Sequence, residues 1–207
     1  MQRSSQMLQP LRPTVLVLAA GQGRRFARSG GTTHKLDAML GDVTVLEQVL
    51  RSVVASGLAY YVVRPAAAPP AAHIDGMGHS IARGVAATAD ADGWLILPGD
   101  LPLVRTQSLM AVALSLATHP VVVPQCGQQQ GHPVGFDRTC REALLQLKGD
   151  TGASAVVRSH RQAGTAHTLQ LDDPGIAIDI DTCDDLARAQ ALLTSGNFGQ
   201  EASLGKR

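Results

Sequence analysis

The stretch VLVLAAGQGRRF, residues 15–26, decides the fold that we expect for this chain. Its first six residues form a continuous apolar run between Pro13 and Gly21, which is typical of a strand covered on both faces. Two glycines and two arginines follow, so the strand is expected to end in a positively charged turn. Because Gly21 and Gly23 allow backbone N–H groups to approach a ligand closely, we expect this turn to hold an anion such as phosphate.

Strands and helices are expected to alternate along the rest of the chain. A capping box at Thr44 and Glu47 predicts the start of a helix, and Gly57 predicts its end. Further helices are expected at 80–89, 106–118, 139–147, 152–160 and from 182 onward, and strands at 60–63, 94–97, 121–123, 132–136, 166–171 and 176–180. This rhythm predicts an α/β fold of three layers, in which helices cover both faces of a doubly wound, mostly parallel sheet.

Length and composition limit the classes of protein to consider. With 207 residues we expect one domain over 14–193, and flexible tails without apolar periodicity at 1–13 and 194–207. A net charge of +1 provides no global field for nucleic acid or an anionic membrane, so we expect neither as a partner. The three cysteines lack metal-ligand spacing, and no apolar run reaches the ~18 residues of a spanning helix. These features predict a cytoplasmic protein.

Three loops should converge where the carboxyl ends of the strands meet, which is where ligands bind in such sheets. The loop at 21–35 contains Arg24, Arg25, Arg28 and Lys35 but no acidic residue. It matches neither common phosphate motif, because GQGRRF lacks the third glycine of a dinucleotide fingerprint and Lys35 does not stand in Gly-Lys-Ser/Thr. We interpret it as a phosphate site, and the alternative is a solvated basic loop.

The other two loops carry acidic residues. Asp100 ends the apolar stretch LILPGDLPLV, residues 95–104, and a carboxylate at a buried strand end needs a partner. Mg²⁺ bound to a triphosphate is a suitable partner, because one or two carboxylates and phosphate oxygens usually hold it. The alternative is a turn-forming aspartate. In DIDTCDDL, residues 179–186, strand alternation would place Asp179 and Asp181 on one face, where one of them can reach the metal.

Six short motifs, in this order and together, resemble the MobA-like nucleotidyltransferase family, and specifically its branch of molybdenum cofactor cytidylyltransferases. They are LAAGQGRRF with HKL, GMGHSIARGV, PGDLP, GHPVGF, GDTGASAVV and DIDTCDDL, and the resemblance covers residues 14–193. The chain departs from the family pattern at Ala27 and Cys183, which stand in place of a glycine and a proline, and in the short passage 64–75.

This resemblance implies a Rossmann variant of the GT-A-like, nucleotide-diphospho-sugar transferase type. It also implies Mg²⁺-dependent transfer of a nucleotidyl group from a nucleoside triphosphate to a phosphate-bearing acceptor, with release of pyrophosphate. The implied nucleotide is CTP, the implied acceptor is molybdopterin, and a molybdoenzyme or its accessory protein is a further implied partner. By the same resemblance Asp100 and Asp181 bind the metal, and Arg24, Lys35 and Asp100 are catalytic. The residues implied to line the nucleotide and cofactor site are Leu18, Ala19, Ala20, Gly21, Gly23, Arg24, Arg25, Lys35, Gly78 and Ser80.

Several alternatives stay open on the sequence alone. The same fold is compatible with GTP or with a sugar-phosphate acceptor, and a carrier of the molybdenum cofactor would need no catalysis. A further alternative is a nicotinamide oxidoreductase, for which the only support is the pair of glycines in the first turn. Ser80 and Asp150 serve either as ligands or as helix caps, and His132 either contacts the acceptor or is structural.

Overall fold

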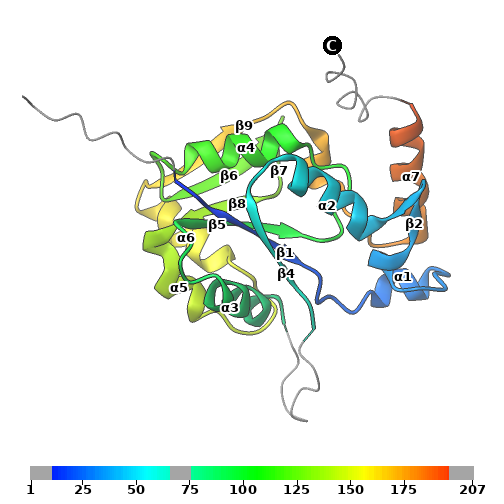
Figure 1. Cartoon of the computed structure of the whole chain (residues 1–207), viewed down its shortest axis with the longest axis horizontal. Coiled ribbons are helices and arrows are strands. Elements are labelled where there is room, and N and C mark those ends of the chain that lie inside the picture. The colour runs from blue at the N-terminus through cyan, green and yellow to red at the C-terminus, as the bar shows by residue number, and fades with distance from the viewer. Residues whose placement is uncertain (1–10, 66–75, 196–207) are drawn as a thin grey trace, which may run out of the picture.

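A seven-stranded sheet lies at the centre of the computed structural model, which describes residues 11–65 and 76–195 (Figure 1). Its strands are β1 (Thr14–Leu18), β4 (Ala59–Val63), β5 (Gly93–Pro98), β6 (Val121–Cys126), β7 (Gln129–Gln130), β8 (Val134–Asp137) and β9 (Ala166–Gln170). The helices are α1 (Arg24–Arg28), α2 (Val45–Ala55), α3 (Met77–Ala87), α4 (Thr106–Ser115), α5 (Arg141–Leu145), α6 (Ser154–Gln162) and α7 (Cys183–Thr194). The remaining elements are the hairpin β2 (Met39–Leu40) and β3 (Val43–Thr44), and the 3-10 turns η1 (Lys35–Asp37), η2 (Arg138–Cys140) and η3 (Pro174–Ala177).

The strand order confirms the expected mostly parallel α/β architecture. The order is β4-β1-β5-β8-β6-β7, and β9 pairs with β6. β1 runs parallel to both β4 and β5, and β6 runs parallel to β9, whereas β8 is antiparallel to β5 and β6. Because Leu18 at the end of β1 lies opposite Pro98 at the end of β5, the loops after these two strands start side by side.

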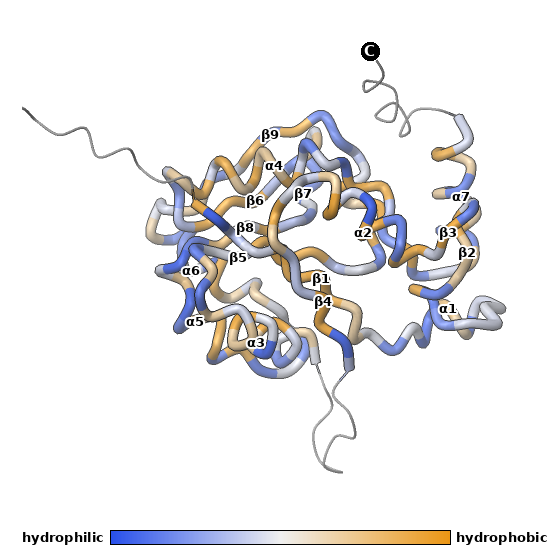
Figure 2. The backbone as a smooth tube through the Cα atoms, in the orientation of Figure 1, coloured by the Kyte–Doolittle hydropathy of each residue, from blue (hydrophilic) through white to orange (hydrophobic). Residues whose placement is uncertain are grey.

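Side chains alternate along the central strands and build one apolar core on each face of the sheet. In β1, Val15 and Val17 belong to the core beneath α2, α4 and α7. Leu16 belongs to the opposite core, together with residues of α3, α5 and α6. Figure 1 shows α3, α5 and α6 on one side of the sheet and α2 and α4 on the other, and Figure 2 shows hydrophobic residues along the central strands between them. A strand buried on both faces explains the continuous apolar run at the start of the chain.

Two helix starts follow the expected local chemistry. Thr44 accepts a hydrogen bond from the Glu47 N–H, and the Glu47 carboxylate accepts one from the Thr44 N–H, which completes the capping box of α2. Thr182 and Asp185 form a second capping box at α7. Asp185 therefore caps the N-terminus of α7, and its negative charge opposes the helix dipole there.

The strand expected at 176–180 is wrong. Its first residues form the end of η3, and the segment to Asp181 has no strand conformation. Ile176 and Ile180 are fully buried, but the Ile176 carbonyl accepts from the His132 N–H and the Ile180 N–H donates to the Asp100 carbonyl. Hydrogen bonds to two other loops thus satisfy the backbone polar groups of this segment. The apolar pattern indicated that the segment is buried, not that it belongs to a sheet.

The basic loop also differs from expectation, because it contains the short helix α1. Phe26, which occupies the position of the missing third glycine, is buried in the core with α2. Helix α3 begins at Met77, three residues before the expected start at residue 80. Both α1 and the beginning of α3 lie near the carboxyl end of β1.

Most of both expected tails, residues 1–10 and 196–207, lies outside the described residues, as does the passage 66–75. The flexible tails and the single-domain boundaries therefore stay predictions. Among the helices of the described segments, none combines the length and the apolar character that crossing a membrane requires.

Candidate active site

A cavity of about 430 Å³ opens at the carboxyl ends of β1 and β5. Most of the expected site residues line it, namely Leu18, Ala20, Gly21, Gly23, Arg24, Arg25, Lys35, Ser80, Asp100 and Asp181. Ala19 and Gly78 do not line it. Ala19 is buried and its N–H donates to the Val63 carbonyl, whereas Gly78 packs against a neighbouring loop. The fold therefore brings the basic loop and both acidic loops to one cavity.

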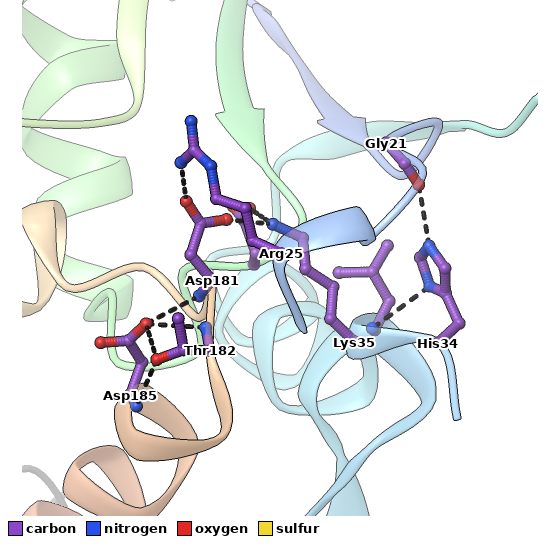
Figure 3. A network of polar contacts seen from close by, with 9 residues as sticks. Gly21, Arg25, His34, Lys35, Asp181, Thr182 and Asp185 are labelled. Carbon is purple, nitrogen blue, oxygen red and sulfur yellow. Dashed lines mark hydrogen bonds and ion pairs between the residues drawn. The ribbon is translucent and has the colours of Figure 1, made fainter. Parts of the chain in front are cut away.

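His34 fixes the shape of the basic loop (Figure 3). Its Nε2 lies 2.8 Å from the Gly21 carbonyl and its Nδ1 lies 3.3 Å from the Leu36 backbone nitrogen. Since a carbonyl only accepts and an amide N–H only donates, Nε2 carries the proton and Nδ1 accepts. Gly23 has a φ of 61°, and a Cβ there would approach the His34 ring to 3.3 Å. The left-handed backbone therefore favours glycine here, and a larger residue would also crowd the His34 ring. This role of His34 was not expected from the sequence.

A lysine joins the two expected metal ligands. Lys35 Nζ lies 2.6 Å from Asp100 Oδ2 and 2.8 Å from Asp181 Oδ1, and these side chains are 11%, 19% and 27% exposed. Arg25 Nη1 approaches the other oxygen of Asp181 at 2.5 Å, from a largely solvent-exposed position. In Figure 3 both cationic side chains point toward Asp181. Lys35 was expected to contact phosphate, whereas here its ammonium is shared between the two carboxylates.

Charge pairing shifts the acid–base properties of this cluster. Burial acts to lower the pKa of Lys35, but the charges of Asp100 and Asp181 and the hydrogen bonds to them outweigh it, so the pKa is raised. The hydrogen bond from Lys35 lowers the pKa of Asp181. Desolvation, together with the charges of Asp100 and Asp181, raises the pKa of Asp179. Asp179 is absent from the cavity lining, whereas Asp181 belongs to it.

The donor set fits a hard divalent cation. Asp100 and Asp181 are close enough to share one ammonium, and the second carboxylate oxygen of Asp100, Oδ1, is buried with no hydrogen-bond partner among the described residues. In residues 11–65 and 76–195 no group of three or more His, Cys, Asp or Glu side chains surrounds a common metal position. Two carboxylates suit Mg²⁺ or Mn²⁺ when phosphate oxygens complete the coordination.

The glycine-rich start of α3 has a packing role. A Cβ on Gly76 would lie 2.3 Å from the Gly149 carbonyl oxygen, and one on Gly78 would lie 2.7 Å from the Lys148 carbonyl oxygen. The Gly78 N–H donates to the Gly149 carbonyl at 2.8 Å. The two glycines therefore let α3 dock against the loop before α6, with the exposed Met77 between them.

The capping alternatives for Ser80 and Asp150 are wrong. Gly76 is the N-cap of α3 and Ala153 is the N-cap of α6. Ser80 is instead buried within α3, and both Ser80 and Asp150 line the cavity. Four further residues line the cavity that had not been expected to, although each stands within one of the quoted motifs. These are Gln22, Leu36, Met77 and Pro98.

A second cavity, of about 460 Å³, shares Met77 with the first and contains His132 in its lining. His132 Nδ1 lies 3.3 Å from the Ile96 carbonyl oxygen, so this nitrogen is the donor. Burial lowers the pKa of His132, which keeps the ring neutral near pH 7. His132 thus combines a structural hydrogen bond with a position beside the candidate site.

Comparisons with known proteins agree with this geometry. A family model described as the MobA-like NTP transferase domain matches residues 15–163. The purine catabolism protein PucB of Bacillus subtilis (strain 168) is 36% identical over 109 residues, which are 52% of this chain and 52% of that protein. The chain thus spans about half the length of this curated relative.

Two solved structures extend the agreement to nearly the whole chain. A nucleotidyl transferase from Methanothermobacter thermautotroptrophicus is 21% identical, with a TM-score of 0.75 over 90% of this chain and 99% of that chain. Rv0371C of Mycobacterium tuberculosis H37Rv in complex with manganese is 24% identical, with a TM-score of 0.67 over 87% of this chain and 98% of that chain. At these identities the likeness concerns the fold.

Proposed function

Because the chain belongs to the MobA-like NTP transferase family, we propose that it transfers a cytidylyl group from CTP to the phosphate of a molybdopterin-type acceptor and releases pyrophosphate. One observation carries this proposal. The glycine-rich turn, the cations Arg24 and Lys35, and the carboxylates of Asp100 and Asp181 all line a single cavity. Nucleotidyl transfer requires this combination, since the reaction joins a polyanionic nucleotide to an anionic acceptor.

The proposed reaction is an in-line displacement at the α-phosphorus. An oxygen of the acceptor phosphate forms the new bond to phosphorus, and the bond to the β-phosphate breaks. The acceptor oxygen is already ionised, so the protein supplies positioning and charge neutralisation and needs no side-chain nucleophile. The Gly21–Arg25 backbone and Arg24, whose side chain has no partner within residues 11–65 and 76–195, bind the triphosphate. Lys35 holds Asp100 and Asp181 together before the nucleotide arrives and then offers its ammonium to phosphate oxygens in the same cavity.

Asp100 and Asp181 would hold the divalent cation, with Mg²⁺ as the proposed ion. When bound, such a cation neutralises the triphosphate and the leaving pyrophosphate. The buried Oδ1 of Asp100 supports this assignment, since a carboxylate oxygen without a hydrogen-bond partner is costly. The manganese complex of the mycobacterial structural neighbour also supports a divalent ion.

The second cavity is the proposed acceptor site. It adjoins the nucleotide cavity at Met77, and the neutral His132 would contact the acceptor there. A molybdoenzyme or its accessory protein would receive the product. The competing substrates are GTP as the nucleotide and a sugar phosphate as the acceptor. The short passage 64–75, where the chain departs from the family pattern, lies mostly outside the described residues.

Pyrophosphate release tests the proposal directly. The purified protein is mixed with Mg²⁺ and CTP, GTP, ATP or UTP, with molybdopterin or a sugar 1-phosphate as acceptor. We expect pyrophosphate with CTP and molybdopterin. Preference for GTP or for the sugar phosphate would replace the substrate assignment, and binding of molybdopterin without pyrophosphate from any nucleotide would indicate a carrier instead of an enzyme.

Asp100→Asn tests the metal assignment. We expect turnover to fall at least ~100-fold, because the variant loses one of two carboxylate ligands. Asp90→Asn, at an exposed aspartate outside the cavity, is the matched control and should retain full turnover. Near-normal turnover in a folded Asp100→Asn protein, with folding checked by circular dichroism, would exclude the metal role.

A further inference from the structure

The second cavity has an apolar floor made from the sheet face beneath α3 and α6. Ile96, Val123 and Val134 of three neighbouring strands contribute to it, and Ile81 and Val157 contribute from the two helices. A volume of about 460 Å³ lies within the range of small-molecule sites, which are apolar with a few polar groups that fix orientation. The cavity therefore suits a ligand with a flat ring system, whose face can pack on the apolar floor, rather than an extended polymer.

The charge of this cavity is one-sided. Arg158 and Arg161 line it from α6, and no aspartate or glutamate lines it. The two arginines are three residues apart, so they share one face of the helix. Both are exposed, and neither guanidinium group has an ion pair or hydrogen bond with another residue of the described chain. His132 adds no charge, since burial keeps it neutral.

The arrangement contrasts with that of three other arginines, which are paired with carboxylates. Arg51 pairs with Asp42, Arg138 with Asp92, and Arg188 with Asp185. Two adjacent guanidinium groups at the rim of an apolar cavity, without carboxylate partners, form a ready site for an anion, because guanidinium binds carboxylate and phosphate oxygens in a bidentate manner.

We propose that the acceptor carries, besides the phosphate that receives the nucleotidyl group, a second anionic group, which Arg158 and Arg161 bind. This inference rests on the proposed function, since it takes the second cavity as the acceptor site. The acceptor phosphate then lies toward Met77, where the two cavities meet, and the ring system lies over the sheet. The substrate class is accordingly a ring-sized molecule with two separate anionic groups. Arg158 and Arg161 select it by charge and take no part in the bond-forming step.

Rigid probes test this charge requirement without the natural acceptor. Arylphosphonates on benzene, naphthalene and biphenyl are compared with the same compounds bearing a carboxylate at the far end, and binding is measured by isothermal titration calorimetry with Mg²⁺ present. We expect at least one carboxylate-bearing probe to bind 10- to 100-fold more tightly than its partner without the carboxylate. The three ring sizes cover different separations of the two charges.

The double variant Arg158→Gln/Arg161→Gln should lose this gain while still binding the simple arylphosphonates. The charge-matched control Arg51→Gln/Arg138→Gln, at arginines outside both cavities, should keep it. The inference is overturned if no carboxylate-bearing probe gains affinity, or if the gain survives in Arg158→Gln/Arg161→Gln.

Pyrophosphate release, measured in parallel, separates this outcome from failure of the proposed function. Release by the wild type without any charge preference in the probes would refute only the second anionic group. Charge-selective probe binding without release from any nucleotide would refute the transferase instead, and with it the acceptor role of the bound molecule.

Discussion

Replacing Lys35 with methionine removes the cation that joins Asp100 and Asp181 but keeps a side chain of similar length. The wild-type ammonium makes hydrogen bonds of 2.6 and 2.8 Å to these carboxylates, and its side chain is only 11% exposed. Removing one partner of a buried ion pair costs about 3–5 kcal/mol, and partial exposure of the two acids reduces this to about 2–4 kcal/mol. Lys35→Met should therefore lower the free energy of unfolding by about this amount in metal-free buffer at pH 7.

The same variant should bind a divalent cation more tightly in the absence of nucleotide. In the wild type, the incoming ion must displace an ammonium held by charge-assisted hydrogen bonds of about 1.5–3 kcal/mol each. Since 1.4 kcal/mol corresponds to a factor of ten, Mn²⁺ affinity should rise about 10- to 100-fold in Lys35→Met. Electron paramagnetic resonance of free Mn²⁺ measures this affinity, and thermal denaturation should show a larger Mn²⁺-induced stabilisation of the variant.

The pH dependence of the stability difference follows from the pKa shifts. The pKa of Asp181 is lowered from 3.8, so its pairing with Lys35 stabilises the fold above that pH and is lost on acidification through the folded-state value. The pKa of Lys35 is raised from 10.5, so its contribution is complete below that pH and is lost as the pH rises through the folded-state value. Wild type and variant should therefore differ most between pH 4 and 10.5.

Arg25→Met provides the control, because it removes a cation from the same Asp181 at a position that is 77% exposed. It should change Mn²⁺ affinity by less than about threefold, as expected for a surface pair. Unchanged or weaker Mn²⁺ binding in Lys35→Met would refute the view that this ammonium occupies the place of the cation.

Three further predictions concern packing, capping and thiol reactivity. Gly84→Ala should destabilise the protein by about 1–2 kcal/mol in urea unfolding, because the added methyl would lie 2.9 Å from Val63 Cγ2 and 3.0 Å from Leu16 Cδ1. This overlap outweighs the gain in helix propensity, and a stabilised variant would contradict the close packing. Thr44→Ala should cost about 1 kcal/mol through loss of the α2 cap, whereas Thr44→Ser should cost much less, and equal costs would argue against the cap. Burial raises the pKa of Cys140 to about 12. Iodoacetamide at pH 8 should therefore modify Cys126 and Cys183 before Cys140 in the native protein, as measured by mass spectrometry. Equal rates at the three cysteines would disprove the protection of Cys140.

Part of the fold could be predicted because its causes are local. The apolar run of β1 and the capping box at Thr44 each depend on residues within one short segment, and both are confirmed. The segment 176–180 could not be predicted, since a run of buried apolar residues looks alike in a strand and in an irregular loop. What decided its conformation was hydrogen bonding to His132 and Asp100, from loops distant in the sequence.

The candidate site divides in the same way. The sequence predicted the basic loop and Asp100, because glycines, cations and a carboxylate at a strand end have specific chemistry, and the family resemblance selected Asp181 over Asp179. Tertiary structure alone decided that Lys35 lies between Asp100 and Asp181, which are 65 and 146 residues away. It also decided that Met77 separates two cavities and that Arg158 and Arg161 face the second one. The reason is physical: a residue type determines which interactions a side chain can make, whereas packing of distant segments determines which partner it meets.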